Sequence, residues 1–316
     1  MDTKATPFVH LHTYSHYSLL EGLLSPADLA RLAVENGMKA IALTDHRCLS
    51  GMVEFSQACE QEGIQPIFGM TVDIEWQRQV GEMVLLVKDR MGWSNLCWLS
   101  SKLMVEEGGV KTFITLDEIR QHYEGLIALS GGQRSILDFF IKTAQQSQAL
   151  EWLTQLKEIF QDSLYIEIQQ PTPSYEVQAH RVVEIAKQVQ IPMVASHSIY
   201  YKDPDQAGLQ KTVSAMRENC RIKDIESEKL APPAAYFVAA KDLVARFHWI
   251  PEAIRNTNRV AELCNWKLPL GEVHFPTIPL PPGKSVSQLL REKAESGAKK
   301  RYKRITAEIQ SRLDHE

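Results

Sequence analysis

Three short histidine-bearing segments are the parts of this sequence best suited to chemistry. His10 and His12 are two residues apart in an apolar stretch, so on a strand both side chains would lie on one face and could bind one ion. His16 follows closely. Imidazoles at strand ends beside carboxylates are the usual components of zinc or manganese phosphoesterase sites. The pattern alone is a weak signal, because such pairs also occur as structural histidines.

Polar residues also follow two other apolar runs. Thr44, Asp45 and His46 come directly after the run at 40–43, and His197 follows the run at 192–196. Ionisable residues placed there suit an active site at the carboxyl ends of barrel strands. The structural alternatives are a turn capped by Asp45 and a lone, non-ligating His197.

Other catalytic motifs are poorly matched. The sequence contains no Gly-x-Gly-x-x-Gly or Gly-x-x-x-x-Gly-Lys spacing, and no Gly-x-Ser-x-Gly motif. Ser130, Gly131 and Gly132 follow an apolar run and could bind an anion through backbone N–H groups, although a plain turn explains them equally well. Nucleotide-binding and serine-hydrolase classes are therefore not indicated.

The first 200 residues alternate strand and helix signals. Three residues predict that a helix starts near residue 25. Ser25 can cap the helix, Pro26 has the backbone angle φ of a first helical residue, and the charge of Asp28 favours the N-terminal end of the helix dipole. About seven such βα repeats predict a parallel sheet, either a barrel or doubly wound. The predicted strands are residues 8–12, 40–43, 65–68, 82–87, 125–130, 164–168 and 192–196.

Helical patterns dominate after residue 200. A proline-rich stretch at 268–284 predicts an extended strap, and a polar segment at 286–313 predicts a helix. This helix carries a basic cluster, which is either a solvated face or a phosphate contact. The cluster comprises Lys299, Lys300, Arg301, Lys303 and Arg304.

Composition narrows the class of protein. The 316 residues include 35 basic and 39 acidic side chains, a net charge of -4, which excludes a globally basic nucleic-acid binder. No apolar run approaches the ~18 residues that span a bilayer, and the start lacks a signal-peptide pattern, so no membrane partner is expected. Five separated cysteines suit reduced thiols, which predicts a cytoplasmic location.

Several ordered motifs resemble the PHP (polymerase and histidinol phosphatase) domain found at the N-terminus of bacterial DNA polymerase III alpha subunits. The resemblance covers roughly residues 8–305. Its motifs include FVHLH at 8–12, YSLLEG at 17–22, ALTDH at 42–46, GIQPIFG at 63–69, GLIALSG at 125–131 and NTNRVAELCN at 256–265.

The resemblance implies an α/β fold, a distorted (β/α)7 barrel of the PHP type with a C-terminal helical extension. Residues 1–270 would form the PHP domain, and 271–316 a strap and polar helix leading toward a polymerase palm outside this sequence. Metal-binding members hold metals with histidine and acidic ligands and support phosphoesterase or 3'-to-5' exonuclease chemistry. In other members the site has decayed, and the domain is structural and sometimes docks a proofreading exonuclease subunit.

Matched position by position, the family's ligand set is largely missing. The resemblance leaves His12, Glu21 and His46 as remnant metal ligands, with His10, His16 and His197 as spare imidazoles that could substitute. No metal is therefore expected, with zinc or manganese at low occupancy as the alternative. The six lost positions fall on Tyr14, Thr71, Glu82, Pro171, Ser198 and Tyr200.

Two functional hypotheses remain. The first is a structural and partner-docking PHP domain of a polymerase III alpha-type replicative polymerase, which meets DNA only indirectly. The alternative is a metal-dependent phosphoesterase or proofreading exonuclease working through the remnant ligands. Whether this chain is itself an enzyme stays open, because the resemblance places the polymerase palm elsewhere.

Overall fold

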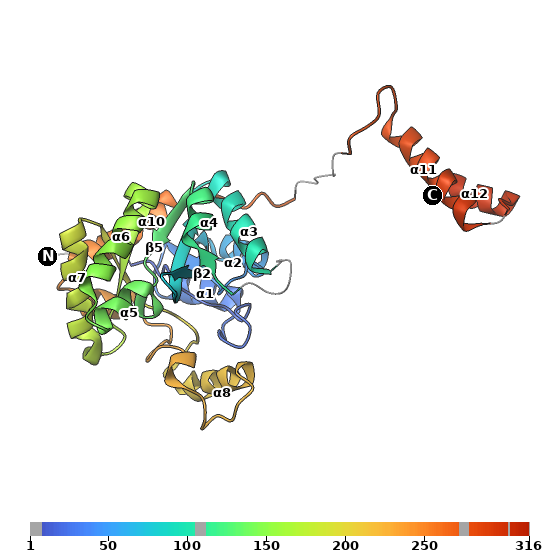
Figure 1. The fold of residues 1–316 in the computed structure, drawn as a ribbon. Coiled ribbons are helices and arrows are strands. Elements are labelled where there is room, and N and C mark those ends of the chain that lie inside the picture. The colour runs from blue at the N-terminus through green and yellow to red at the C-terminus, as the bar shows by residue number, and fades with distance from the viewer. Residues whose placement is uncertain (1–7, 105–111, 272–277, 303, 316) are drawn as a thin grey trace. The chain divides into compact units, whose positions relative to one another are not determined.

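The computed structural model describes residues 8–104, 112–271, 278–302 and 304–315. These residues form two compact units that divide between Leu268 and Pro269. The first unit is a sheet wrapped by helices, and the second contains two helices (Figure 1). Among the described helices, none combines the length and apolar character required to cross a membrane.

The sheet of the first unit is mixed. Its order is β1-β2-β3-β5-β6-β7, with β4 beside β2, and β3 runs antiparallel to both of its neighbours while the other pairs are parallel. The strands are β1 (Ala40–Leu43), β2 (Gln65–Trp76), β3 (Gln79–Val87), β4 (Ile114–Thr115), β5 (Leu126–Leu129), β6 (Leu164–Gln169) and β7 (Met193–Ser196).

The prediction of a fully parallel sheet is wrong at β3. Gln77 and Arg78 make a two-residue turn with φ of 49° and 67°, and such left-handed turns join antiparallel strands. Neither residue is glycine or asparagine, so the usual hairpin signal is missing. As a consequence Glu82 of β3 lies opposite Asp73 of β2.

The N-terminal segment closes the sheet into a barrel. It is not the regular strand predicted at 8–12, since only Thr13 forms a β-bridge, with Ile199. Its carbonyls nevertheless accept hydrogen bonds on both sides, from Ala42 N to His10 O (2.9 Å) and from Ile199 N to His12 O (3.3 Å). The predicted distorted α/β barrel with a helical extension is therefore confirmed.

Local signals explain several helix ends. α1 begins as predicted, with a capping box between Ser25 and Asp28 and with Pro26 in the first turn. The described helices are α1 (Pro26–Glu35), α2 (Met52–Glu62), α3 (Arg90–Met104), α4 (Leu116–Gln121), α5 (Ile136–Lys142), α6 (Gln146–Phe160), α7 (Glu176–Val189), α8 (Ala207–Arg217), α9 (Ala240–Arg246), α10 (Pro251–Leu263), α11 (Val286–Arg301) and α12 (Ala307–His315).

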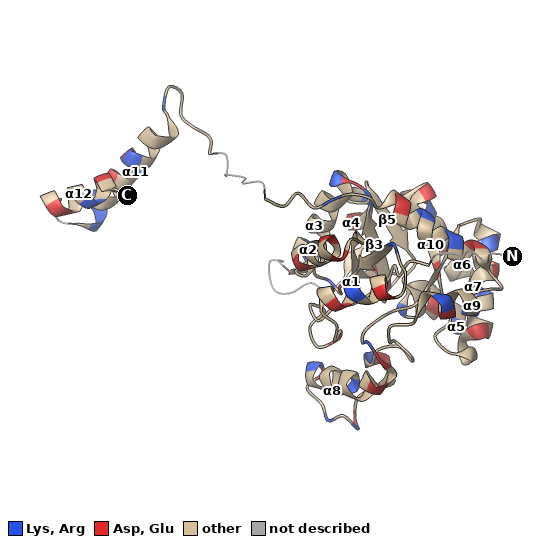
Figure 2. Ribbon diagram, turned by 180° about the vertical axis from the view of Figure 1, so that it is seen from behind, with Lys and Arg blue, Asp and Glu red and all other residues tan. Residues whose placement is uncertain are grey.

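The C-terminal unit differs from its prediction. The helix predicted over 286–313 is divided into α11 and α12, because the backbone at Tyr302 is extended and the Thr306 hydroxyl accepts from Ile309 N at the start of α12. Both signs of charge occur along α11 (Figure 2).

One end of the barrel is covered by α10. Gln65 at the start of β2 donates to Ala261 O (2.8 Å), and Asn256 donates to Met193 O at the start of β7 (2.8 Å). These contacts place α10 over the amino ends of the strands. The carboxyl ends therefore face the opposite rim.

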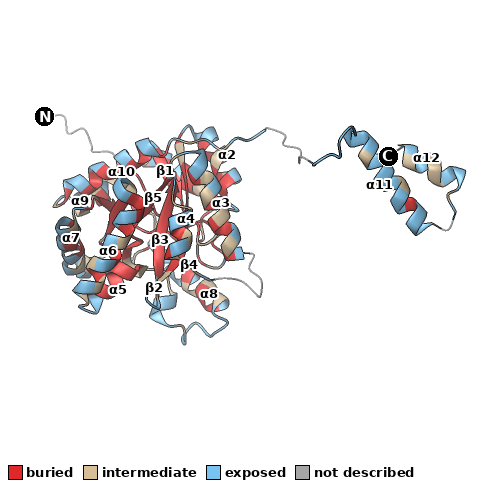
Figure 3. Ribbon diagram, turned by 45° about the horizontal axis from the view of Figure 1, so that its top comes forward, coloured by how far each residue is buried: buried red, intermediate tan, exposed pale blue. Residues whose placement is uncertain are grey.

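The core lies on both faces of the sheet. Along β1 every residue is buried, and the alternation of a strand sends Ile41 and Leu43 toward the surrounding helices, while Ala40 and Ala42 pack in a separate cluster with Leu11. Figure 3 shows buried strands beneath helices whose outer faces are exposed. The apolar core thus fixes the barrel rim that holds the polar residues.

Close packing of α3 against the β5 entry gives a testable prediction. A side-chain carbon on Gly92 would lie 1.9 Å from Gly125 O, whereas one on Gly208 in α8 would meet open space. Gly92→Ala should lower the free energy of unfolding by about 1–3 kcal/mol, measured by urea denaturation. Gly208→Ala is the control and should leave stability unchanged or slightly higher. Equal stability of both variants would contradict this packing.

Candidate functional site

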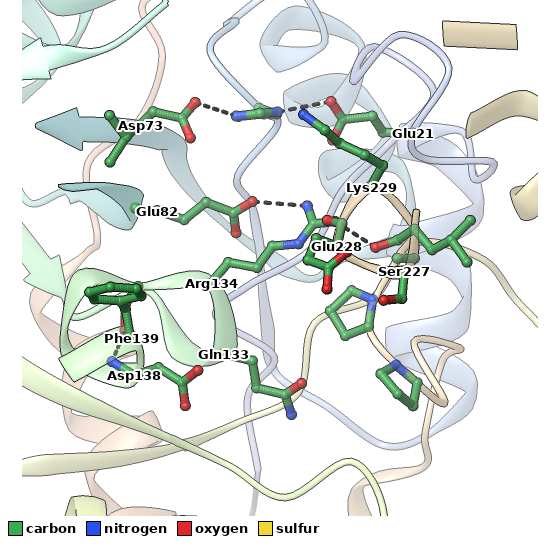
Figure 4. A pocket seen from close by; sticks show the side chains of 18 of the residues that line it. Glu21, Asp73, Glu82, Gln133, Arg134, Asp138, Phe139, Ser227, Glu228 and Lys229 are labelled. Carbon is green, nitrogen blue, oxygen red and sulfur yellow. Dashed lines mark hydrogen bonds and ion pairs between the residues drawn. The ribbon is translucent and has the colours of Figure 1, made fainter. Parts of the chain in front are cut away.

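The polar rim surrounds a cavity of about 1020 Å³ at the carboxyl ends of the strands. Its charged side chains come from the loops after β1 and β5, the middle of the β2–β3 hairpin and the end of α8. Others come from the segment before α1, from α5 and from residues 227–233 (Figure 4). Because β3 is antiparallel, its Glu82 reaches the same rim as residues that follow parallel strands. The cavity lining is therefore assembled from segments that are distant in sequence.

A first set of side chains, the inner network, consists of Glu167, His12, Tyr14, Glu82 and Arg134. His12 Nδ1 lies 2.8 Å from Glu167 Oε1, and its Nε2 lies 2.7 Å from the Tyr14 hydroxyl. Tyr14 donates to Glu82 (3.3 Å), and Arg134 Nη1 donates to the same carboxylate (3.0 Å). The network thus alternates acceptors and donors from the barrel interior to the cavity.

Charges in the inner network support one another. Burial alone would lower the pKa of His12, but the adjacent Glu167 and Glu82 carboxylates outweigh it and raise that pKa. Burial opposes ionisation of Glu167, yet His12 lowers the pKa of this carboxyl. Burial and Glu82 raise the pKa of Tyr14, so its hydroxyl stays a neutral donor. We assign His12 and Glu167 as a buried ion pair.

A second set, the outer network, consists of Arg47, Asp73, His46, Glu21 and Arg217. His46 Nε2 donates to Asp73 (2.7 Å), and its Nδ1 donates to Glu21 (2.9 Å). Arg47 donates to Asp73, and Arg217 Nη1 lies 3.2 Å from Glu21. Burial disfavours the charged imidazole, but hydrogen bonds to the two carboxylates prevail and raise the pKa of His46 to about 10.

Most predicted ligand positions lie near these networks. His12, Tyr14 and Glu82 belong to the inner network, and Glu21 and His46 belong to the outer one. The remaining predicted positions are arranged around them: Thr71 and Ser198 each lie 3.4 Å from a ring nitrogen of His12, Tyr200 stacks on Tyr14 with ring centroids 4.2 Å apart, and Pro171 is buried outside both networks.

The spare imidazoles take other partners. His10 Nε2 lies 2.9 Å from Val238 O, and His197 Nε2 lies 3.0 Å from Tyr236 O, so both rings anchor one backbone segment. Burial lowers the pKa of His10 to about 3, and burial together with the nearby Arg246 lowers the pKa of His197 to about 4, so both rings are neutral. His16 is exposed and packs on Tyr17.

The side chains present do not fit a multinuclear metal centre. Both ring nitrogens of His12 and of His46 are engaged, whereas a ligating imidazole must offer a free lone pair. His10 Nδ1 is buried without a hydrogen-bond partner, but one imidazole is too few for zinc. Within the described residues, no group of three or more His, Cys, Asp or Glu side chains could hold a metal ion.

Several residues of the two networks were missed from the sequence. Asp73 lies two residues beyond Thr71, hence on the same face of β2, and Glu167 interrupts the apolar strand β6. An acidic residue inside an otherwise apolar strand was the available signal for both. Arg134 and Arg217 carried no such signal, since they follow β5 and end α8 among ordinary polar residues.

The basic cluster belongs to the C-terminal unit. Lys299, Lys300 and Arg301 form the last turn of α11 and are exposed, as is Arg304. Cations there complement the negative end of the helix dipole, which gives them a structural explanation. Lys303 lies outside the described residues.

The outer network predicts a pH optimum of stability. Because folding raises the pKa of His46 from 6.5 to about 10, its contribution is complete below 6.5 and is lost as pH rises toward 10. Glu21 and Asp73 have lowered pKa values, so their contribution is lost as pH falls below their ordinary values of 4.5 and 3.8.

The free energy of unfolding, measured in urea across this range, should therefore be greatest between about 4.5 and 6.5. His46→Gln should flatten the alkaline decline, leaving the part contributed by His12. An alkaline decline of unchanged slope in His46→Gln would contradict the assignment of His46 as the cation.

Comparison with known proteins places this geometry in context. Residues 10–171, slightly more than half of the chain, match the PHP domain. The chain is 28% identical to a DNA polymerase III subunit alpha of Treponema pallidum and 29% identical to one of Aquifex aeolicus, in each case over 98% of this chain. It spans only 28% and 29% of the length of those relatives.

Solved structures are more distant. An amidohydrolase from Chromobacterium violaceum is 16% identical with a TM-score of 0.43, covering 61% of this chain and 87% of that one. A two-domain protein from Bacteroides vulgatus, described as containing a predicted PHP-like metal-dependent phosphoesterase, is 15% identical with a TM-score of 0.36, covering 60% of this chain and 51% of that one.

The match over residues 10–171 shows that this chain belongs to the PHP domain family.

Proposed function

We propose that this chain is the PHP domain of a DNA polymerase III alpha-type replicative polymerase and that its role is structural and partner-docking. The observation that carries the proposal is that protein cations pair with the carboxylates around the cavity. At the rim, His46, Arg134 and Arg217 neutralise Asp73, Glu82 and Glu21 in hydrogen-bonded networks. Such pairs stabilise the rim and leave the carboxylates without a catalytic task.

The first partner in this proposal is the rest of the polymerase chain. The relatives that match nearly the whole of this chain are about three and a half times as long, and they are DNA polymerase III alpha subunits. The proline-rich strap and the C-terminal helices would then lead from residues 1–270 toward the palm. A proofreading exonuclease subunit is the second proposed partner.

The five cysteines are free thiols, which suits the proposed cytoplasmic location.

The rival function is a metal-dependent phosphoesterase or exonuclease. It would require His46 to surrender its hydrogen bonds to both Glu21 and Asp73 and to lose a proton held with a pKa of about 10. It would also require ligands at positions occupied by Thr71 and Tyr200. The networks therefore favour the structural role.

Elemental analysis of protein purified without chelators tests this choice. We expect zinc and manganese contents no higher than in a His12→Ala/His46→Ala double variant, because the remnant imidazoles are already engaged. The same two samples should show equal, background nuclease activity with and without added manganese. Near-stoichiometric metal that is lost in the double variant, together with metal-dependent nuclease turnover, would establish the rival function.

Direct contact with DNA through the basic cluster forms a separate proposal. Exposed Lys300 lies in this cluster, and exposed Lys293 lies earlier on the same helix. If the cluster contacts phosphates, Lys300→Glu should weaken DNA binding and reduce the salt slope of log K by about 1 or more. The matched variant Lys293→Glu should change both quantities less, in a fluorescence anisotropy titration over a range of salt concentrations. Equal effects of the two variants would mean that the cluster makes no specific phosphate contact and acts only through its general positive charge.

A further inference from the structure

Residues 227–233 line the cavity on the side of α8, and together with Glu226 they form the segment here called the rim loop. The loop contains a short 3-10 turn, Ser227–Lys229. Every one of its residues is exposed or half-buried, and its small apolar anchor is Ala231, which packs against the cluster of Tyr14 and Tyr200. Apolar burial therefore contributes little to holding the loop in place. Its position must therefore depend largely on polar contacts.

Three consecutive carbonyls of the rim loop accept hydrogen bonds from two arginines. Arg134 Nη2 donates to Glu228 O (3.1 Å) and to Leu230 O, and Arg217 Nη2 donates to Lys229 O (2.7 Å). Figure 4 shows Arg134 between Glu82 and this loop. Two guanidinium groups that are distant in sequence thus bind adjacent peptide units of the loop.

Each of these arginines also belongs to one of the two networks. Arg134 pairs with Glu82 at the end of the inner network, and Arg217 pairs with Glu21 at the end of the outer network. A guanidinium is a rigid planar fork, so a carboxylate that holds one edge orients the remaining N–H groups. Both networks therefore end on the same loop. Glu82 orients the N–H groups of Arg134, and Glu21 orients those of Arg217 together with Glu218, which accepts from Arg217 Nε (3.0 Å).

The other contacts of the rim loop are weaker. Ala231 N donates to Gln210 Oε1 at 3.4 Å, and Lys229 Nζ lies 4.0 Å from Glu218 at an exposed position. An exposed ion pair at that distance contributes little, whereas hydrogen bonds from charged donors are about twice as strong as neutral ones. The arginines are therefore the main attachments of the loop.

We propose that the rim loop is a lid latched by Arg134 and Arg217, which stays closed over the cavity while these arginines pair with Glu82 and Glu21 and opens as a unit when the pairs are broken. Opening would uncover Glu82, Arg134 and the half-buried residues at the cavity wall. The lid would thus couple the ion pairs of the two networks to the surface that a partner meets.

Hydrogen–deuterium exchange of the full chain tests the latch. The reporting amides are those of Lys229 and Leu230, which donate within the loop turn, and that of Ala231. In Arg134→Met and in Arg217→Met, exchange at these amides should rise about tenfold or more, because each variant removes charge-assisted hydrogen bonds. Exchange in β5 and β6 should stay at the wild-type rate.

Arg31→Met is the matched control, since Arg31 is an exposed arginine of α1 that pairs with Asp28 far from the loop. It should leave loop exchange unchanged. Trypsin cleavage after Lys229 provides a second readout and should accelerate in the two latch variants only. Glu21→Gln keeps both arginines but removes one orienting charge, so it should open the loop partly.

The outcomes separate the latch from simpler explanations. Wild-type exchange and cleavage rates in both latch variants would overturn the proposal. The loop would then be held in place by its chain connections and by the hydrogen bond to Gln210 without the arginines. Equal acceleration in the loop and in β6 would mean general destabilisation and would also overturn it. If Arg134→Met fails to fold, Arg217→Met and Glu21→Gln decide the question.

Discussion

The two networks contain four buried carboxylates, and the arrangement of the barrel around the cavity depends on how the charges of these four are neutralised. Glu21, Asp73, Glu82 and Glu167 are each at least nine-tenths buried. A buried carboxylate without a counter-charge would cost several kcal/mol, and removing one partner of such a pair typically destabilises by about 3–5 kcal/mol. Protein cations supply the counter-charge here, through the imidazoles and guanidiniums of the two networks. The barrel thus supplies, from its own side chains, the positive charge that its acidic residues require.

The β2–β3 hairpin makes this arrangement geometrically workable. By running antiparallel it brings Glu82 opposite Asp73, so two carboxylates from one hairpin serve two different networks. The inner network then crosses the barrel through His12 and Tyr14 to Glu167 on the far strand. A rigid apolar core on both faces of the sheet holds these groups within hydrogen-bond distance. The polar rim and the apolar core are therefore mutually dependent, since displacement of either would leave charges unpaired.

Sequence reasoning reached the fold but only part of the site. The strand and helix rhythm, the Ser25–Asp28 cap and the run of family motifs were local features, and local features determine elements and barrel class. The antiparallel strand escaped prediction because Gln77 and Arg78 adopt left-handed angles without the residues that usually signal them. Matching the sequence to the family's ligand positions predicted that ligands are lost at Thr71 and Tyr200. This matching could not predict the ion pairs that the structure contains. The pairs of Arg134 with Glu82 and of Arg217 with Glu21 join segments that only the folded chain brings together.

The protonation state of His46 tests the central claim most directly. If protein cations neutralise the rim, both ring nitrogens of His46 carry protons and donate to Glu21 and Asp73. Nitrogen-15 NMR of labelled protein, purified without chelators and recorded at a pH midway between 6.5 and 10, should then show an imidazolium, since the pKa of His46 is raised to about 10. A neutral imidazole, or a ring nitrogen with the shift of a metal-bound ligand, would contradict the replacement of metal ions by side-chain cations.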